Sequence, residues 1–222
     1  MILLTGGSGL LGSQLQNLIS CIAPTQDEFD ILHPVLPPDI HMIVHAAAYT
    51  DVAKAQDDVL TVTEVNVRGT KNMCSFGLPI VYISTEYVFD GTKGNYDEND
   101  IINPLSVYAM TKAQGEGYVA EIPRHLIIRT LFKPDPFKHE RAFIDQWTTG
   151  DYIDVIAPMI AKAIHLFDKN YVRGTLHIGT EKKSTYELAS RSRRVTAIRR
   201  SQVGTPMPRD TSLNCSKWES LQ

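Results

Sequence analysis

The sequence predicts an α/β fold in which a doubly wound parallel sheet carries helices on both faces. Three observations favour it. The apolar run at 2–4 meets a glycine turn and then a helical pattern of leucines within a dozen residues. Two further apolar runs, 39–48 and 79–85, end in small or hydroxyl-bearing residues. Helix-like segments separate these runs, and parallel strands need such crossover connections.

The glycine turn has the spacing of a nucleotide-binding loop. Gly6, Gly9 and Gly12 form the pattern GxxGxxG between the first strand and a helix that begins near Leu10. In such loops the glycines permit a tight turn, a close backbone approach to the ligand, and packing of helix on strand. The helix N-terminus then offers unpaired N–H groups to a pyrophosphate. A glycine turn between strand and helix is often only a turn, so the motif needs support from the rest of the chain.

Composition limits the classes of function. The chain has 222 residues, 43% of them hydrophobic, and a net charge of −3, which gives no reason to expect a nucleic-acid or membrane surface. Its length favours one core with an appendage. Cys21, Cys74 and Cys215 are an odd number without CxxC spacing, which indicates reduced thiols rather than disulfides or a metal site. Since the sequence shows neither a signal peptide nor a membrane span, we expect a cytoplasmic protein.

The second strand, expected at 21–24, bears on the choice of cofactor. In a dinucleotide fold its end carries an acidic residue for the ribose 2′-OH or a basic residue for a 2′-phosphate. Here stand the neutral Thr25 and Gln26. Asp27 follows slightly late, either as a carboxylate that selects NAD(H) or as a solvated loop residue. The choice stays open, with a slight preference for NADP(H). The proline-rich stretch that ends at residue 38 is expected to be a loop.

The run at 39–48 is the next expected strand, and it ends in three alanines. Small residues at the end of a parallel strand let a flat ligand lie against the backbone. Alternatively, the alanines simply pack under a helix. A second helix is expected at 63–76, and Asn66 lies within it. An asparagine in the middle of a helix is usually on a solvated face.

The strand expected at 79–85 ends in Ser84 and Thr85, and a helix that begins shortly after carries Tyr108 and Lys112 on one face. This spacing suits proton transfer. A lysine ammonium one turn away lowers the pKa of a tyrosine, which is otherwise near 10. Either hydroxyl at the strand end can then hold a substrate oxygen. A Tyr/Lys pair on a helix is by itself most often amphipathic patterning, but its position after a nucleotide-type loop favours catalysis.

Together, the motifs TGGSGLLG, HAAAYTDVAKA, NVRGT, YISTEYVFDG and NPLSVYAMTKAQGE resemble the extended short-chain dehydrogenase/reductases, above all their dTDP-4-dehydrorhamnose reductase branch. The resemblance covers residues 1–130. It implies a Rossmann fold and an oxidoreductase that uses NADP(H) or NAD(H) to reduce the 4-keto group of a dTDP- or UDP-linked 6-deoxy sugar, as in dTDP-rhamnose biosynthesis. Two alternatives share this fold: a sugar-nucleotide epimerase or dehydratase, and an NAD(P)-binding regulatory subunit with little turnover.

The resemblance also assigns roles to residues. Tyr108 would donate the proton, Lys112 would lower its pKa and hold the nicotinamide ribose, and Thr85 would bind the substrate carbonyl. Together with Tyr108 and Lys112, the cofactor would be bound by Gly6, Gly9, Leu10, Leu11, Gly12, Asp30, Ile31, Ala46, Ala47, Ala48 and Asn66. The substrate would contact Tyr49, Glu86 and Tyr87. Glu86 stands where an aspartate is expected, which lengthens that carboxylate.

Beyond residue 130 the resemblance weakens. We expect an NAD(P)-binding domain at 1–140 and a reduced substrate-binding lobe at 141–222, interleaved with the last elements of the sheet. A segment that contributes a helix and a strand to sugar binding in the family is compressed into 133–143. The lobe carries a basic cluster, which is either a solvated face or a contact for the substrate diphosphate: Arg191, Arg193, Arg194, Arg199 and Arg200. The oligomeric state stays open, with a homodimer as one alternative.

Overall fold

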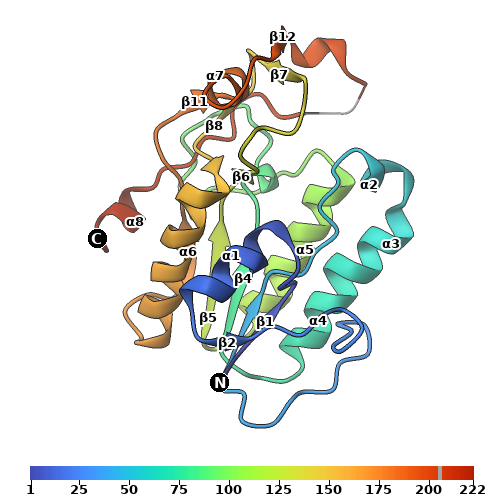
Figure 1. Ribbon diagram of the computed structural model, residues 1–222, viewed down its shortest axis with the longest axis vertical. Coiled ribbons are helices and arrows are strands. Elements are labelled where there is room, and N and C mark those ends of the chain that lie inside the picture. Colours follow the sequence, from blue (N-terminus) through green and yellow to red (C-terminus); the bar gives the residue numbers. More distant parts are fainter. Residues whose placement is uncertain (205–206) are drawn as a thin grey trace.

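The computed structural model describes residues 1–204 and 207–222. Its centre is a six-stranded parallel sheet with the strand order β10-β5-β4-β3-β1-β2 (Figure 1). The order reverses between β1 and β3, and ligands of such sheets bind at this switch point, outside the carboxyl ends of the strands. The predicted α/β fold is confirmed. The strands are β1 (Ile2–Thr5), β2 (Cys21–Ile22), β3 (Met42–His45), β4 (Ile80–Ile83), β5 (His125–Arg129) and β10 (Gly174–His177).

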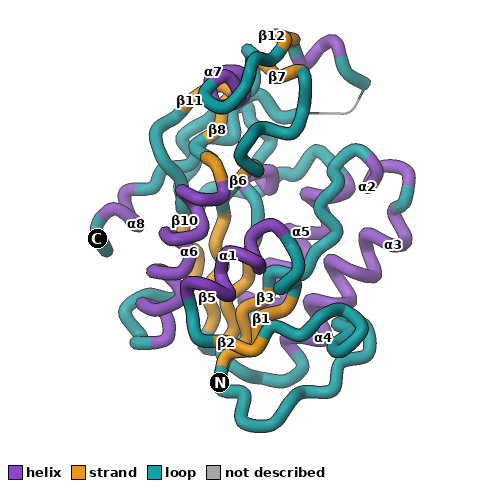
Figure 2. Tube along the Cα trace, in the orientation of Figure 1, coloured by secondary structure: helices purple, strands orange, loops and turns teal. Residues whose placement is uncertain are grey.

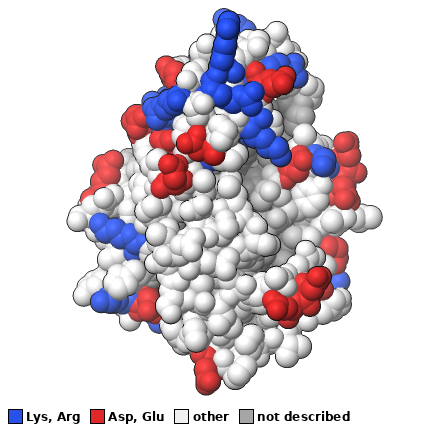
Figure 3. Space-filling model, in the orientation of Figure 1, with Lys and Arg blue, Asp and Glu red and all other residues white. Residues whose placement is uncertain are grey.

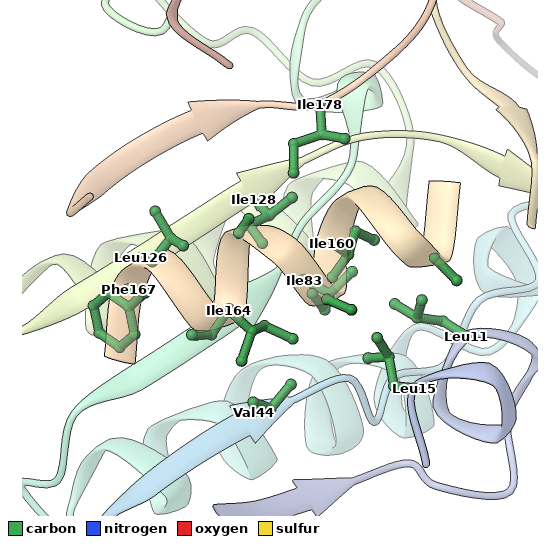
Figure 4. Packing of buried hydrophobic residues seen from close by; sticks show 14 of the residues in the cluster. Leu11, Leu15, Val44, Ile83, Leu126, Ile128, Ile160, Ile164, Phe167 and Ile178 are labelled. Atoms are coloured by element: carbon green, nitrogen blue, oxygen red, sulfur yellow. The ribbon is translucent and has the colours of Figure 1, made fainter. Parts of the chain in front are cut away.

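Helices cover both faces of this sheet (Figure 1). One face carries α1 (Leu10–Leu18) and α6 (Ile153–Asp168), which pack against each other. The other face carries α2 (Lys54–Asp57), α3 (Val59–Thr63), α4 (Gly69–Cys74) and α5 (Val107–Ala120). Successive strand residues point to opposite faces, so Val44 joins the core under α1 and α6 while Ile43 joins the core under α4 and α5. Figure 4 shows the first of these cores, where Ile160 and Ile164 of α6 meet the strand residues.

The helix expected at 63–76 is present, but it begins earlier and runs without a break from residue 59 to residue 74. A π-helical turn, η1 (Glu64–Arg68), joins α3 to α4. Such turns occur often at functional sites because they rotate the side chains that follow. The next residue, Gly69, lies against Ile31, since a Cβ atom built there would be 2.5 Å from Ile31 Cδ1.

Beyond the carboxyl ends of the strands lies a lobe of short elements and loops (Figures 1 and 2). Its sheets have only two strands each, so side chains rather than backbone ladders must stabilise it. Its strand pairs are β6 (Phe132–Lys133) with β9 (Asp151–Tyr152), β7 (Arg141–Phe143) with β12 (Thr196–Ile198), and β8 (Trp147–Thr148) with β11 (Lys183–Ser184). Its helices are η2 (Glu86–Val88), α7 (Thr185–Ser190) and η3 (Arg200–Gln202), and α8 (Ser216–Glu219) ends the chain.

The predicted division into a domain at 1–140 and a lobe at 141–222 stays a prediction. In this division the second unit supplies part of the central sheet and one of the helices that cover it. Both α6 and β10 come from the second unit, and they lie on and in the central sheet. Within the described ranges, no helix combines the length and hydropathy needed to cross a bilayer. The same ranges contain no cluster of three histidine, cysteine or acidic side chains suited to a metal ion.

Candidate active site

The glycine turn between β1 and α1 leaves no room for side chains. Gly6 has φ +74°, and a Cβ atom on it would lie 2.6 Å from the backbone nitrogen of Ala47. A Cβ atom on Gly12 would collide with the carbonyl oxygen of Gly6 and lie 2.7 Å from Gly7 Cα. Gly9 caps α1, and its N–H donates to the Gly6 carbonyl at 3.0 Å. These contacts explain why glycine stands at the first and third positions of the motif.

The N-terminus of α1 is open to an anion. Among the described residues, the backbone N–H groups of Leu10, Leu11 and Gly12 have no acceptor, and the first turn carries no acidic side chain. Unpaired donors and the helix dipole together favour a phosphate there. The alanines after β3 border this turn, since the N–H groups of Ala46 and Ala47 donate to the Thr5 carbonyl and hydroxyl at 3.2 and 3.3 Å. Contacts of Ala46, Ala47 and Ala48 with a cofactor stay predictions.

The side chain of Asn66 is buried, and the expectation of a solvated face is wrong. The residue is 1% exposed because η1 turns it inward. Its Oδ1 accepts from the Tyr49 N–H at 2.7 Å, and its Nδ2 donates to the Tyr49 carbonyl at 3.1 Å and to Thr111 Oγ1 at 3.0 Å. Asn66 therefore fastens the segment after β3 to α5, and its contact with a cofactor stays a prediction.

Asp30 and Ile31 lie in the loop after β2, and hydrogen bonds hold this loop in place. Asp30 Oδ1 accepts from the N–H of Leu32 at 2.9 Å, and Asn72 Nδ2 donates to the Ile31 carbonyl at 2.9 Å. The loop after β2 is thus attached to α4, which gives it a fixed place beside the sheet. Their proposed position at the adenine remains a prediction from the resemblance.

The structure brings Thr85, Tyr108 and Lys112 together at the carboxyl end of β4. Ser106 caps α5 by accepting from the Ala109 N–H at 3.3 Å, which starts the helix just before Tyr108. The Thr85 side chain lies close enough to the half-buried Tyr108 phenol to favour its ionised form. Lys112 lies one turn further along the helix and is 3% exposed. Sequence spacing alone predicts this grouping, because a strand end and the start of the following helix share one edge of the sheet.

Burial dominates the electrostatics of these groups. It raises the pKa of Tyr108 to about 12, although the Thr85 hydrogen bond acts in the opposite direction. It lowers the pKa of Lys112 to about 7, although the Glu116 carboxylate favours the charged form. The net lowering of the tyrosine pKa that the sequence suggests is therefore wrong for the free protein, because desolvation of the phenolate outweighs the effect of Thr85. Tyr108 keeps its proton, as a proton donor must.

A buried ion pair that the sequence analysis missed decides between Ser84 and Thr85. Glu116 accepts from Arg129 Nη2 at 2.7 Å, and the Ser84 hydroxyl donates to the same carboxylate at 2.5 Å. Ser84 is thus occupied by Glu116, and Thr85 is the one of the two hydroxyls that acts on the pKa of Tyr108. In the sequence, the only sign of a role for Glu116 is that it follows Lys112 by one helical turn on α5.

Comparison with known proteins agrees with this geometry. The family described as "RmlD substrate binding domain" matches residues 1–133. This chain belongs to that family. It is 34% identical to a dTDP-4-dehydrorhamnose reductase of Aggregatibacter actinomycetemcomitans over 68% of this chain, a match that spans about half (52%) of that reductase. It is 28% identical to the methionine adenosyltransferase 2 subunit beta of Rattus norvegicus, over 99% of this chain and 82% of that protein.

A solved structure extends the likeness to the whole chain. The dTDP-4-dehydrorhamnose reductase of Bacillus anthracis, crystallised in complex with NADP, superposes with a TM-score of 0.83 at 25% identity. The superposition covers 99% of this chain and 92% of that chain. The lobe beyond residue 133 therefore follows the architecture of this RmlD-family reductase, although the family match ends there.

In this RmlD-family chain, Glu86 joins the sheet to the lobe. Its side chain is fully buried and accepts from Thr148 Oγ1 at 2.8 Å and from Thr211 Oγ1 at 2.7 Å. Burial raises its pKa to about 7. Tyr87 beside it is also buried, which raises its pKa well above the ordinary value. Both Glu86 oxygens thus have partners within the chain. Substrate contact by Glu86, Tyr87 and Tyr49 stays a prediction.

The basic cluster gathers at the upper end of the molecule, over the lobe (Figure 3). Several of its members are bound within the lobe. Arg191 pairs with Glu181 at 2.6 Å and with Asp151 at 3.4 Å, and Arg200 Nε donates to the Asp145 carbonyl at 3.0 Å. Arg193 donates to a backbone carbonyl. These contacts favour a structural role for them over binding of a substrate diphosphate.

Proposed function

We propose that this chain is an NADPH-dependent reductase of the 4-keto group of a nucleotide-linked 6-deoxy sugar, with a dTDP- or UDP-linked substrate. The observation that carries the proposal is the grouping of Thr85, Tyr108 and Lys112 at the carboxyl end of β4, with the Tyr108 phenol protonated and Lys112 one helical turn away. Relatives and a structural neighbour named dTDP-4-dehydrorhamnose reductase support it. Epimerase or dehydratase chemistry on the same fold is the nearest competing reaction.

The residues around α1 fit a dinucleotide. The turn in which a Cβ atom on Gly6 or Gly12 would collide with backbone lets a pyrophosphate approach closely, and the free N–H groups of Leu10, Leu11 and Gly12 supply its donors. NADP is the cofactor named for the Bacillus anthracis structure. At the end of β2, Glu28 accepts from the Thr25 N–H at 2.9 Å, so this carboxylate is bound within its own loop. The cofactor of that neighbour favours NADP(H), while the exposed Asp27 stays the carboxylate that would select NAD(H).

The chain's own groups then divide the chemistry between them. When bound beside these residues, NADPH would supply the hydride that reduces the keto carbon. The Thr85 hydroxyl holds the carbonyl oxygen, and Tyr108 transfers its phenolic proton to that oxygen, which becomes the product hydroxyl. The charged Lys112 stabilises the phenolate that Tyr108 leaves behind, so its charge state matters most after proton transfer.

The test is oxidation of NADPH, followed by absorbance, with dTDP-4-dehydrorhamnose as substrate. We expect wild-type turnover, and a kcat at least one hundredfold lower in Tyr108→Phe with an unchanged Kd for NADPH. Tyr118→Phe is the matched control, because Tyr118 lies on the same helix and is also half-buried, but its ring faces Lys71 and not the site. Equal rates in Tyr108→Phe and Tyr118→Phe would contradict the proposal. Parallel assays with UDP-linked and 4-hydroxy sugars separate reductase from epimerase or dehydratase activity.

A second candidate is an NAD(P)-binding subunit without turnover, which the match to methionine adenosyltransferase 2 subunit beta over 99% of this chain favours. Thermal shift with NADPH, NADH, dTDP and UDP distinguishes the two. Stabilisation by a dinucleotide alone favours the subunit, whereas stabilisation by dTDP or UDP favours the enzyme.

Two further proposals concern the setting of the protein. We place it in the cytoplasm, since Cys21, Cys74 and Cys215 are free thiols that suit a reducing compartment. A homodimer stays the alternative to a monomer, and light scattering of the purified chain decides between them.

A further inference from the structure

The ammonium of Lys112 lies over the face of a tyrosine from the central sheet. Its Nζ is 4.1 Å from the ring centroid of Tyr82, which belongs to β4. Tyr82 is fully buried, and Lys112 is 3% exposed. Among the described residues, the ammonium has no hydrogen-bond acceptor and no carboxylate within ion-pair distance. The ring face lies at a distance typical of a cation–π interaction and is thus a partner for the ammonium.

Among the other groups around Lys112, the Glu116 carboxylate also favours the charged form of the lysine, but it is paired with Arg129. Glu116 and Tyr108 lie on the same helix, but the Glu116 carboxylate is bound by Arg129 and Ser84, and burial keeps the Tyr108 phenol protonated. From β3, His45 stacks on Tyr82 with ring centroids 5.7 Å apart. Burial, with a smaller contribution from Lys112, lowers the pKa of His45 to about 3, so His45 is neutral and adds no opposing charge near pH 7.

Tyr82 is itself fixed on several sides. Its hydroxyl donates to the carbonyl of Lys112 at 3.4 Å. The hydroxyl fits against α5 because residue 115 is a glycine, where a Cβ atom would collide with it. His45 in turn bonds to Thr5 Oγ1 at 2.7 Å, directly before the glycine turn. A continuous buried path therefore joins the α5 lysine to the turn.

We propose that Tyr82 is a positioning residue for Lys112. The face of the Tyr82 ring helps to keep the lysine ammonium charged and in place in the free protein. The catalytic consequence rests on the proposed reductase function, because there the charged lysine stabilises the Tyr108 phenolate. The physical interaction between ring and ammonium does not depend on turnover.

The experiment has two measurements on the full-length chain. NMR titration of ¹³C-labelled lysines gives the Lys112 pKa, with its resonance assigned by its loss in Lys112→Met. The pH profile of kcat/KM reports groups of the free enzyme. We expect Tyr82→Met to lower the Lys112 pKa by about one unit, as loss of a desolvated cation–π contact implies. The alkaline limb of the profile should move to lower pH by the same amount, and kcat/KM at pH 7.5 should fall about tenfold.

Two controls isolate the ring face. Tyr82→Phe keeps the ring and loses only the hydroxyl, so the Lys112 pKa and the pH profile should stay as in the wild type. Phe167→Met removes an equally buried ring far along α6 and should leave the Lys112 resonance unchanged. If Tyr82→Met does not fold, pentafluorophenylalanine at position 82 keeps the shape of the ring and removes its negative face.

The outcomes separate cleanly. An unchanged Lys112 pKa in folded Tyr82→Met, or the same fall in Tyr82→Phe, overturns the positioning role. If the wild type does not oxidise NADPH, the proposed function fails, and the NMR titration still decides whether the ring holds the ammonium.

Discussion

The glycine turn and the C-terminal lobe are held in place by opposite means. In the turn, the absence of side chains at Gly6 and Gly12 lets backbone touch backbone. In the lobe, the strands are two or three residues long, and buried polar side chains hold them. Lys183 is 3% exposed and binds Asp151 Oδ2 and the Gly150 carbonyl, both at 3.1 Å. The turn thus depends on its local sequence, and the lobe depends on partners distant along the chain.

The largest effect should come from adding one methyl group to the turn. In Gly12→Ala the new Cβ atom meets the Gly6 carbonyl and Gly7 Cα, and these backbone atoms cannot move aside as a flexible side chain could. We expect the free energy of unfolding to fall by more than about 3 kcal/mol. The Kd for NADPH should rise at least tenfold in the folded fraction. Urea denaturation and fluorescence titration check the two effects.

Gly204→Ala is the matched control, since no atom of residues 1–204 and 207–222 lies within 4 Å of a Cβ atom there. Wild-type stability and NADPH affinity in Gly12→Ala would show that the turn tolerates side chains, and the contrast with the lobe would disappear.

This contrast also explains which features the sequence could predict. The motif from Gly6 to Gly12 is local, and the Thr85–Tyr108 grouping follows from the shared edge of strand and helix. The burial of Asn66 depends on a π-helical turn that packing imposes, and propensity gives no sign of it. The partners of Glu86 lie 62 and 125 residues away, and two-residue strands have no periodicity to detect.

A smaller effect on the free energy of unfolding should come from the buried Glu86 carboxyl, which bonds the sheet to the lobe and makes stability depend on pH. Burial raises the pKa of Glu86 to about 7, above the ordinary value of 4.5. The folded state therefore keeps this proton between pH 4.5 and 7 while the unfolded state releases it. The stability that the neutral carboxyl gives at low pH is lost as the pH rises through this window. Relative to the wild type, Glu86→Gln should gain roughly 2–3 kcal/mol in the free energy of unfolding between pH 4.5 and 8.

This gain must be measured as a difference between the variant and the wild type. His45 and His177 have pKa values lowered to about 3 by burial, so their contribution to stability runs the other way, rising with pH. The exposed Glu64→Gln is the control and should reproduce the wild-type curve. If the stability curves of the wild type and Glu86→Gln run parallel across this pH range, Glu86 is ionised throughout. The carboxylate would then bind Thr148 and Thr211 in its charged form.

The smallest effect separates glycines that the fold requires from those it only tolerates. Gly115 and Gly117 lie two residues apart on α5. A Cβ atom at residue 115 would collide with the Tyr82 hydroxyl, whereas at residue 117 no atom of the described part of the chain lies within 4 Å. Gly117→Ala should raise the free energy of unfolding by about 0.5–1 kcal/mol, because alanine has the higher helix propensity. Gly115→Ala should lower it, and less so in a Tyr82→Phe background where the hydroxyl is gone. Urea denaturation of the four variants gives each value. A stabilising Gly115→Ala would mean that α5 moves away from β4 at no cost, and the close packing that brings Lys112 onto the Tyr82 ring would not be rigid.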